Sequence, residues 1–192
     1  MSDMSFMQNY GEYDHVDRTQ RKFALSAWER TFSLTEDDFL KEQAKCRRLC
    51  PNHHQQHSHN QRRDEAKVYS QKPNAQYGRA AYARGLAHNN MRKREAGECA
   101  ECHLPVVAGE ECMFAWDHLG LVSHNKHREV SKMLQNSSAT IDAEIKKCRL
   151  LDHNCHAKWT AEQRKQASVL GLKTDLPPKK KRKLGRLKQE ID

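Results

Sequence analysis

An internal repeat is the feature that most limits how this chain can fold. An Asp-His step is followed in both copies by a glutamate, by a cysteine four residues later, and by an Asn-x-His step. The cysteine precedes the last histidine by eight residues in each copy, and 39 or 38 residues separate the first histidine from the last. Such a pattern indicates that one structural unit occurs twice. The first copy comprises Asp14, His15, Glu42, Cys46, Asn52 and His54, and the second comprises Asp117, His118, Glu144, Cys148, Asn154 and His156.

The composition favours small metal-stabilised units over one large core. Only 36% of the 192 residues are hydrophobic, and small units with thin cores often depend on a metal for stability. The seven cysteines are an odd number, and Cys99 and Cys102 make a Cys-x-x-Cys pair. With no secretory segment at the N-terminus, they favour metal binding in a reducing compartment over disulfides. No run of about 18 apolar residues occurs, so no membrane span is expected.

Charge divides the chain into four segments. Residues 1–60 and 97–160 contain the two repeats, residues 61–96 form a connector, and residues 161–192 form a tail. The formal net charge of +9 is uneven, because the connector carries +6 and residues 157–192 carry +7, whereas the remainder carries −4. Basic flanks around acidic units indicate a polyanionic partner, most simply DNA or RNA.

The connector combines basic residues with tyrosines, a composition suited to phosphate contacts and base stacking. A solvated, partly helical linker is the alternative, since Pro73, Gly78 and Gly85 are expected to interrupt a helix here. The predicted nucleic-acid contacts are Arg62, Arg63, Arg79, Arg84, Arg92, Lys93 and Arg94.

A basic run after two prolines is the main feature of the tail. The run comprises Lys179, Lys180, Lys181, Arg182 and Lys183. Such runs act as nuclear import signals or as nucleic-acid patches, and this one resembles the import signal of the polyomavirus large tumour antigen. The resemblance implies a nuclear location, an import receptor as a partner, and a eukaryotic or viral source. The alternatives are a generic basic tail and an appended signal.

Taken together, the Asp-His step, the Lys-Cys pair after a helix and the Asn-x-His step resemble the HNH nuclease family. In that family two strands and a helix hold one divalent ion beside a histidine base. The resemblance implies an α+β chain of two small, zinc-associated ββα-metal units joined by the basic connector. In the second repeat it implies His118 as general base, Asp117 and His156 as ligands of Mg²⁺ or Mn²⁺, and Asn154 as the residue that orients the loop or the base. In the first repeat the corresponding residues are His15, Asp14, His54 and Asn52.

The family closes a zinc site with two Cys-x-x-Cys pairs, and this chain departs from that pattern. Cys99 and Cys102 supply the first pair, but Asp152 and Cys155 stand in the place of the second. A carboxylate can bind zinc, and His153 is the alternative to Asp152. The resemblance therefore implies a structural zinc ion held by three sulfurs and by one of these two side chains.

The first repeat has half of such a zinc site. Cys50 and His53 match the second pair, but no Cys-x-x-Cys precedes residue 13. Either this repeat has lost the metal, or Cys99 and Cys102 serve Cys50 and His53 across the repeats. The other cysteines are expected to pack in the interior: Cys46, Cys112 and Cys148.

Local patterns predict a helix before each Asn-x-His step. The spacing of Thr35 and Asp38 predicts a capping box that starts a helix over residues 36–47. A second helix is predicted over residues 140–149, and residues 22–26 have the composition of a short strand.

The resemblance implies a metal-dependent DNA endonuclease or nickase that acts in the nucleus. In that chemistry a histidine takes a proton from water, while a hard cation stabilises the charge on the phosphate. One alternative is an HNH-fold protein that binds or packages DNA with weak cleavage or none. A zinc-stabilised adaptor is a third hypothesis, but an adaptor would not need the matched histidines.

Overall fold

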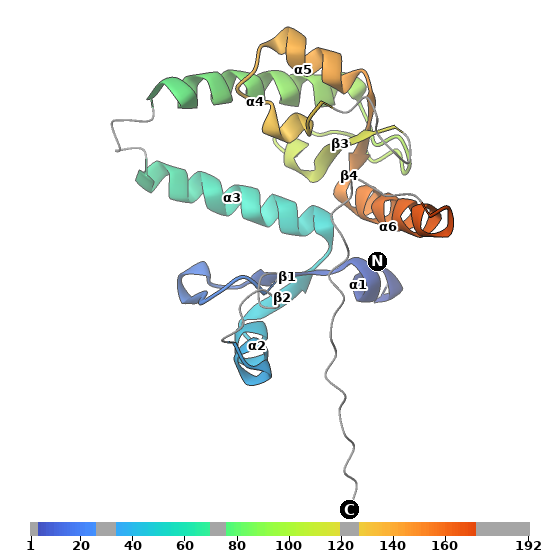
Figure 1. Cartoon of the computed structure of the whole chain (residues 1–192). Coiled ribbons are helices and arrows are strands. Elements are labelled where there is room, and N and C mark those ends of the chain that lie inside the picture. Colours follow the sequence, from blue (N-terminus) through green and yellow to red (C-terminus); the bar gives the residue numbers. More distant parts are fainter. Residues whose placement is uncertain (1–3, 26–33, 70–75, 120–126, 172–192) are drawn as a thin grey trace, which may run out of the picture.

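The computed structural model describes residues 4–25, 34–69, 76–119 and 127–171, and it has a mixed α+β fold (Figure 1). Two separate two-stranded antiparallel sheets lie in different parts of the chain. The predicted mixed fold with small sheets is therefore confirmed. The basic run at residues 179–183 lies outside the described residues.

The first sheet and the helices around it form the first unit. β1 (Glu12–His15) pairs with β2 (Cys46–Leu49), and α2 (Glu36–Gln43) lies between them in the chain. α3 (Pro51–Tyr69) begins two residues after β2 ends, so the first turn of this helix is held beside the sheet. The short helix α1 (Met4–Tyr10) precedes β1.

The second unit repeats the same order of elements. β3 (Phe114–His118) pairs with β4 (Cys148–Asp152), and α5 (Ser138–Ile145) lies between them in the chain. α6 (His153–Val169) follows β4 directly. A short 3-10 helix, η4 (Glu111–Met113), precedes β3. Both units therefore consist of an antiparallel strand pair followed by a long helix.

The register of the two sheets is the same with respect to the repeated residues. In both sheets the histidine of the Asp-His step lies opposite the cysteine that starts the second strand. The aspartate lies opposite the arginine that follows this cysteine. The four pairs are His15 with Cys46, Asp14 with Arg47, His118 with Cys148, and Asp117 with Arg149.

Both predicted helices are shorter than the sequence suggested. α2 ends at Gln43 and not at residue 47, and α5 ends at Ile145 and not at residue 149. The residues beyond each helix pair as β2 or β4, and pairing with a strand distant in sequence outweighs local helix propensity. The predicted start of α2 is confirmed, because Thr35 and Asp38 form a complete capping box. Residues 22–25 do not form the predicted strand, and Ser26 lies outside the described residues.

Two long helices occupy the connector. α3 extends to Tyr69, and α4 (Gln76–Ala96) passes through Gly78 and Gly85 without a break. The prediction that these glycines interrupt the helix is therefore wrong, while Pro73 lies outside the described residues. α3 contacts α6 and η4 of the second unit, and its first turn lies beside the start of α6 (Figure 1). No helix in the described part of the chain is long and apolar enough to cross a membrane.

Gly85 is the point of closest approach between α4 and the second unit. A Cβ atom at this position would lie 1.9 Å from the carbonyl oxygen of Leu134. Real Cβ atoms do not approach a backbone oxygen so closely, so glycine permits the helix to pack against this segment. A packing requirement therefore explains a glycine that looks, in the sequence alone, like a helix breaker.

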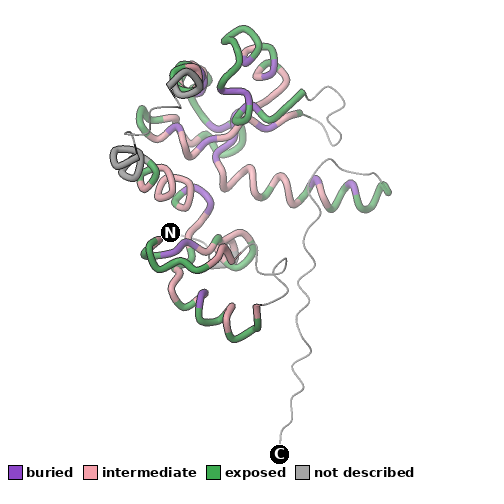
Figure 2. Tube along the Cα trace, turned by 60° about the vertical axis from the view of Figure 1, so that its left-hand side comes forward, coloured by how far each residue is buried: buried purple, intermediate pink, exposed green. Residues whose placement is uncertain are grey.

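The apolar core lies in the second unit. It consists of two clusters of buried side chains, and Trp116 on β3 packs against both. The clusters comprise Cys99, Phe114, Leu150 and Leu151, and Val130, Met133 and Ile141. Among the described residues of the first unit, the buried ones are Pro51 and four polar residues, which lie on β1, on α2 and at the start of α3 (Figure 2). The first unit is therefore held by polar contacts and by its junction with the second unit.

Candidate metal centre and duplicated histidine site

Each Asp-His step places its histidine against a buried glutamate. Nε2 of His15 lies 2.9 Å from Oε1 of Glu42, and Nε2 of His118 lies 2.7 Å from Oε1 of Glu144. Both glutamate side chains are at most 3% exposed. These glutamates stand four residues before the cysteine in each repeat, so their recurrence was visible in the sequence, although no role was predicted for them.

Hydrogen bonds keep Glu144 ionised. Burial alone raises the pKa of this carboxyl, but three donors outweigh burial and lower the pKa to about 2. The donors are the Lys147 ammonium at 2.7 Å, the His118 ring and the backbone N–H of His127 at 3.0 Å. The carboxylate is therefore a pure acceptor at neutral pH.

Glu42 has the same environment in the first unit. Burial raises the pKa of its carboxyl, but the Lys45 ammonium at 2.7 Å, the backbone N–H of Lys22 at 2.8 Å and the His15 ring lower it to about 2. Both buried glutamates thus have one lysine, one histidine and one backbone donor. The set of contacts is duplicated along with the sequence pattern.

The ionised glutamates determine which ring nitrogen carries a proton in each histidine. Because the carboxylate only accepts, Nε2 of His15 and of His118 must donate the hydrogen bond. In the neutral ring the lone pair then resides on Nδ1. Each neutral ring therefore presents Nδ1, and not Nε2, as its acceptor nitrogen.

The aspartate of each Asp-His step lies beside the last histidine of the same repeat. Oδ1 of Asp117 is 3.7 Å from Nε2 of His156, and Oδ1 of Asp14 is 3.8 Å from Nε2 of His54. Both separations are below twice the bond length of about 2.1 Å that Mg²⁺ prefers. The residues expected to bind the divalent ion therefore come together in both units.

An arginine faces the other oxygen of each aspartate. Nε of Arg149 lies 3.2 Å from Oδ2 of Asp117, and Nε of Arg47 lies 3.4 Å from Oδ2 of Asp14. Arg149 is the more firmly placed, because its guanidinium stacks 4.0 Å above the Trp159 ring. These arginines follow the repeated cysteine in both copies, which is the signal that would have identified them.

The first unit adds a histidine that the second lacks. Nδ1 of His57 lies 2.7 Å from Oδ2 of Asp14. The position 102 residues later is Trp159. In the same unit, a hydrogen bond with the Glu12 carboxylate raises the pKa of His54. The two sites are therefore alike in their aspartate and last histidine but differ in the neighbouring side chains.

The two asparagines connect the units to each other. The backbone N–H of Asn52 donates to Oδ1 of Asn154 at 3.2 Å, and the backbone N–H of Asn154 donates to Oδ1 of Asn52 at 3.0 Å. These bonds join the first turns of α3 and α6. Within the described part of the chain, the hydrogen bonds of these asparagines run to each other and to Asp152. Their expected role, to orient the loop or the base, stays a prediction.

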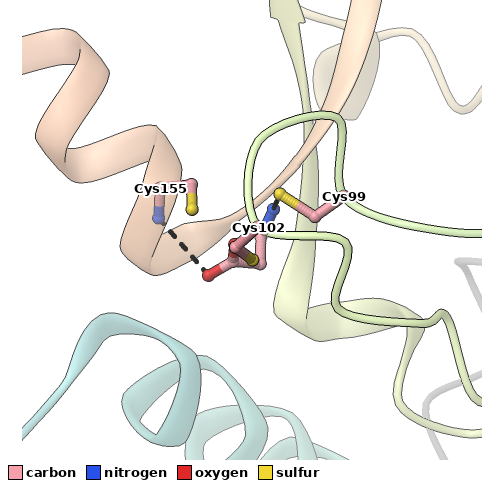
Figure 3. Close-up of side chains that lie close together, drawn as sticks. Cys99, Cys102 and Cys155 are labelled. Atoms are coloured by element: carbon pink, nitrogen blue, oxygen red, sulfur yellow. Dashed lines mark hydrogen bonds between the residues drawn. The ribbon is translucent and has the colours of Figure 1, made fainter.

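Four potential metal ligands form a compact cluster in the second unit. The ligand atoms of Cys99, Cys102, Asp152 and Cys155 all lie within 4.8 Å of one another. Figure 3 shows Cys155 on the first turn of α6, facing Cys99 and Cys102 on the loop opposite. Three thiols and one carboxylate in a small group are a donor set suited to zinc. The cluster is thus compatible with a structural metal site at the four residues expected from the sequence.

Charge in this cluster resides on the carboxylate. Burial raises the pKa of the Cys102 thiol to about 11, and burial also raises the pKa of Cys155, with a further contribution from Asp152. Burial acts on Asp152 in the same direction, but hydrogen bonds from the three cysteines and from Asn52 lower its pKa to about 2. Because cysteine binds metal as the thiolate, metal binding at Cys102 and Cys155 would release protons.

The structure distinguishes between the alternatives for the remaining zinc ligands. Asp152, and not His153, belongs to the cluster, while burial lowers the pKa of His153 to about 4. In the first unit, Sγ of Cys50 lies 3.1 Å from Nδ1 of His53. Among the described residues, Cys50 and His53 do not form one group of potential ligands with Cys99 and Cys102. A zinc site shared between Cys50, His53 and these cysteines is therefore not formed.

The other three cysteines are half-buried. The thiols of Cys46 and Cys148 donate to the carbonyl oxygens of Glu42 and Glu144, both at 3.4 Å. Burial raises the pKa of Cys112. The expectation that they pack in the interior is met only in part.

Lys93 is not on the surface that the sequence assigned to nucleic acid. Lys93 is only 7% exposed, and its ammonium donates to the carbonyl oxygens of Glu111 at 2.8 Å and Phe114 at 2.6 Å. Burial lowers the pKa of Lys93 to about 8. This lysine connects α4 to the segment that leads into β3, so its role in the fold is structural.

The arginines of the connector fall into three groups. Arg92 is paired with Asp142 and Glu95, both at 2.7 Å, and Arg94 is paired with Glu111. Arg62 and Arg84 are exposed. The side chains of Arg63 and Arg79 lie outside the described part of the chain. Within the described side chains, Arg62 and Arg84 are thus predicted contacts that are open to solvent.

Comparison of the chain with family models, with curated proteins and with solved structures gives no match. The assignment of a function therefore depends on the residues and contacts within the chain itself.

Proposed function

We propose that the chain is a metal-dependent nuclease of the HNH type that nicks or cleaves DNA in the nucleus. The observation that supports this function is the duplicated arrangement of Asp, His, Glu and His, with matching atoms at matching distances in both units. A structural framework alone would not require two ionisable sites to keep the same contacts. The expected nuclear location depends on the resemblance of residues 179–183 to an import signal.

The proposed chemistry assigns one task to each side chain of the second unit. Asp117 and His156 would hold the divalent ion, which when bound stabilises negative charge on the phosphate. Nδ1 of His118 would accept a proton from the attacking water. Glu144 would hold the ring in the required tautomer and stabilise the imidazolium. In the first unit the same tasks would belong to Asp14, His54, His15 and Glu42.

A structural zinc ion would complete the second unit. The cluster of Cys99, Cys102, Asp152 and Cys155 joins the loop before η4 to the end of β4 and the start of α6. A metal bound there would fasten three segments that the small apolar core alone holds weakly. Its role would be to fix the strand and helix that carry Asp117 and His156.

A protein that binds or packages DNA with weak cleavage or none is the second candidate function. The arginines beside Asp14 and Asp117 favour it, because they already supply positive charge to the carboxylates expected to hold the catalytic ion. Under this alternative the two Asp-His sites would be remnants of the fold, and the basic connector and tail would bind DNA or RNA.

Plasmid nicking separates the two candidate functions. Supercoiled plasmid is incubated with the full chain and Mg²⁺ or Mn²⁺, with and without a chelator, while binding is measured by gel shift. We expect ion-dependent nicking, and a variant with His15→Ala and His118→Ala should nick about 10²–10⁴ times more slowly, the usual effect of losing a general base.

The control is His127→Ala, because only the backbone of His127 contacts Glu144 and its side chain is exposed. This variant should nick at the wild-type rate. A wild-type chain that shifts the plasmid but leaves it supercoiled with both ions would support the binding or packaging function.

A further inference from the structure

The carboxylate of Asp152 has two differently occupied oxygens. Oδ2 lies 3.1 Å from Sγ of Cys102 and is therefore on the side of the thiols. Oδ1 accepts from the backbone N–H groups of Asn154 at 2.9 Å and Cys155 at 3.3 Å, and from Nδ2 of Asn52 at 2.9 Å. Oδ2 is thus the oxygen available to a metal, and the contacts of Oδ1 determine how the carboxylate is turned.

Asn52 is the one side chain among these three donors, and it comes from the other unit. Its residue is 8% exposed and stands 100 positions before Asp152 in the chain. Its amide is fully assigned, because Oδ1 accepts from the backbone N–H of Asn154 while Nδ2 donates to the carboxylate. If the amide oxygen and nitrogen were exchanged, the NH₂ group would face the backbone N–H of Asn154, and the oxygen would face the Asp152 carboxylate.

We propose that Asn52 of the first unit positions the Asp152 carboxylate for metal binding, so that the metal affinity of the second unit depends on docking of the first. The inference rests on the metal site of the proposed function. The two repeats would then share one site: the second supplies the metal ligands, and the first orients the ligand Asp152.

The coupling must act in both directions. If docking of Asn52 raises the affinity of the cluster for zinc, then bound zinc must favour the docked arrangement by the same factor. Side chains that orient a metal ligand commonly change metal affinity by about 10–100-fold. Zinc would therefore stabilise the junction between α3 and α6 as well as the second unit.

Other contacts keep the units together when Asn52 is altered. Nε2 of Gln56 lies 3.4 Å from Oε1 of Glu110, and the Lys158 ammonium lies 5.1 Å from the centre of the Phe6 ring. Replacing Asn52 therefore tests the orientation of the carboxylate in a chain whose units still have points of contact.

The test compares Asn52→Ala with Asn154→Ala in the full chain. Each variant loses one side-chain acceptor of a hydrogen bond between the units, but only Asn52→Ala loses the donor to Asp152. The backbone N–H of residue 154 remains in both. Zinc affinity is measured by competition with a chromophoric chelator at fixed pH. We expect a loss of about 10–100-fold for Asn52→Ala and less than about threefold for Asn154→Ala.

Equal losses in the two variants would overturn the inference, because the effect would then come from docking in general. No loss in Asn52→Ala, or no zinc binding by the wild-type chain, would overturn it as well. The measurement of zinc affinity does not involve nucleic acid, so the plasmid assay tests the proposed activity independently.

Amide hydrogen exchange provides the reciprocal measurement. Removal of zinc should speed exchange in the first turn of α3 in the wild-type chain, and it should have much less effect there in Asn52→Ala. If zinc protects only the second unit in the wild-type chain, the two repeats are not coupled through this site and the inference fails.

Discussion

Glu144 shows how much of the candidate site depends on one buried charge. Its carboxylate joins His118, Lys147 and the backbone of His127, and these contacts hold its pKa at about 2. A group whose pKa is lower in the folded chain stabilises the fold above its unfolded pKa, which is 4.5 for this carboxyl. That contribution is lost as the pH falls from about 4.5 towards 2.

We expect Glu144→Gln to lower the free energy of unfolding at pH 7 by roughly 1–3 kcal/mol, the usual effect of losing hydrogen bonds to a charged group. Its stability should also change less between pH 4.5 and pH 2 than that of the wild-type chain. Urea unfolding across this pH range measures both effects. Glu162→Gln is the control, because that carboxylate is half-exposed on α6. Equal pH dependence in all three proteins would contradict the assignment.

Some residues of the site were predictable because their chemistry recurs at a fixed spacing. The family resemblance carried by the Asp-His and Asn-x-His steps implies that Asp117 and His156 lie together, and they do. The burial of Lys93 was not predictable, because a lysine among arginines has the composition of a solvent-facing surface. The contact between Asn52 and Asp152 was equally hidden, since it joins residues 100 positions apart.

At the scale of elements, the strands and the ends of the helices depend on different information. The order of elements in each unit follows from the repeated pattern. The ends of α2 and α5 do not, because β2 and β4 pair with strands more than 20 residues away. α4 continues through Gly85 for a similar reason, since its close contact with Leu134 is made by tertiary packing.

Gly85→Ala should therefore destabilise the chain, although alanine is the better helix former. The added methyl group would meet the backbone oxygen of Leu134 at 1.9 Å, so α4 would have to move. Overpacking of this kind costs about 1–3 kcal/mol, while the gain in helix propensity is at most about 1 kcal/mol. Urea denaturation of the metal-loaded chain measures the net change.

The control for this prediction is Ala87→Ser, at an exposed position of the same helix. It should change stability by less than about 0.5 kcal/mol. A Gly85→Ala variant more stable than the wild-type chain would show that α4 does not pack against Leu134 in solution.

For the whole molecule, the separation of charge determines how nucleic acid can bind. The two repeats are acidic in sum, whereas the connector and the tail are basic. Phosphates are therefore expected to approach the connector and the tail first and to reach the repeats only where a cation is bound. Lys93 is buried, and Arg92 and Arg94 are paired with acids. The other basic residues of the connector are therefore expected to make most of its phosphate contacts.

Replacing Arg62, Arg63, Arg79 and Arg84 with glutamine should weaken binding to all DNA sequences alike. The slope of log affinity against log salt should become less steep by roughly 0.9 for each phosphate that the protein no longer neutralises. Fluorescence anisotropy at several salt concentrations measures this slope. Arg92→Gln with Arg94→Gln is the control and should change it less. An unchanged slope in the fourfold variant would show that the connector does not bind phosphate.

The reciprocal bonds between Asn52 and Asn154 have a consequence for how the chain can diverge. Equivalent residues that contact each other across an approximate two-fold axis are the mark of an isologous dimer. In a true homodimer every substitution appears on both sides of the axis. Joined in one polypeptide, the two halves are free to specialise, and one has a compact set of potential metal ligands while the other contributes the amide that contacts one of them.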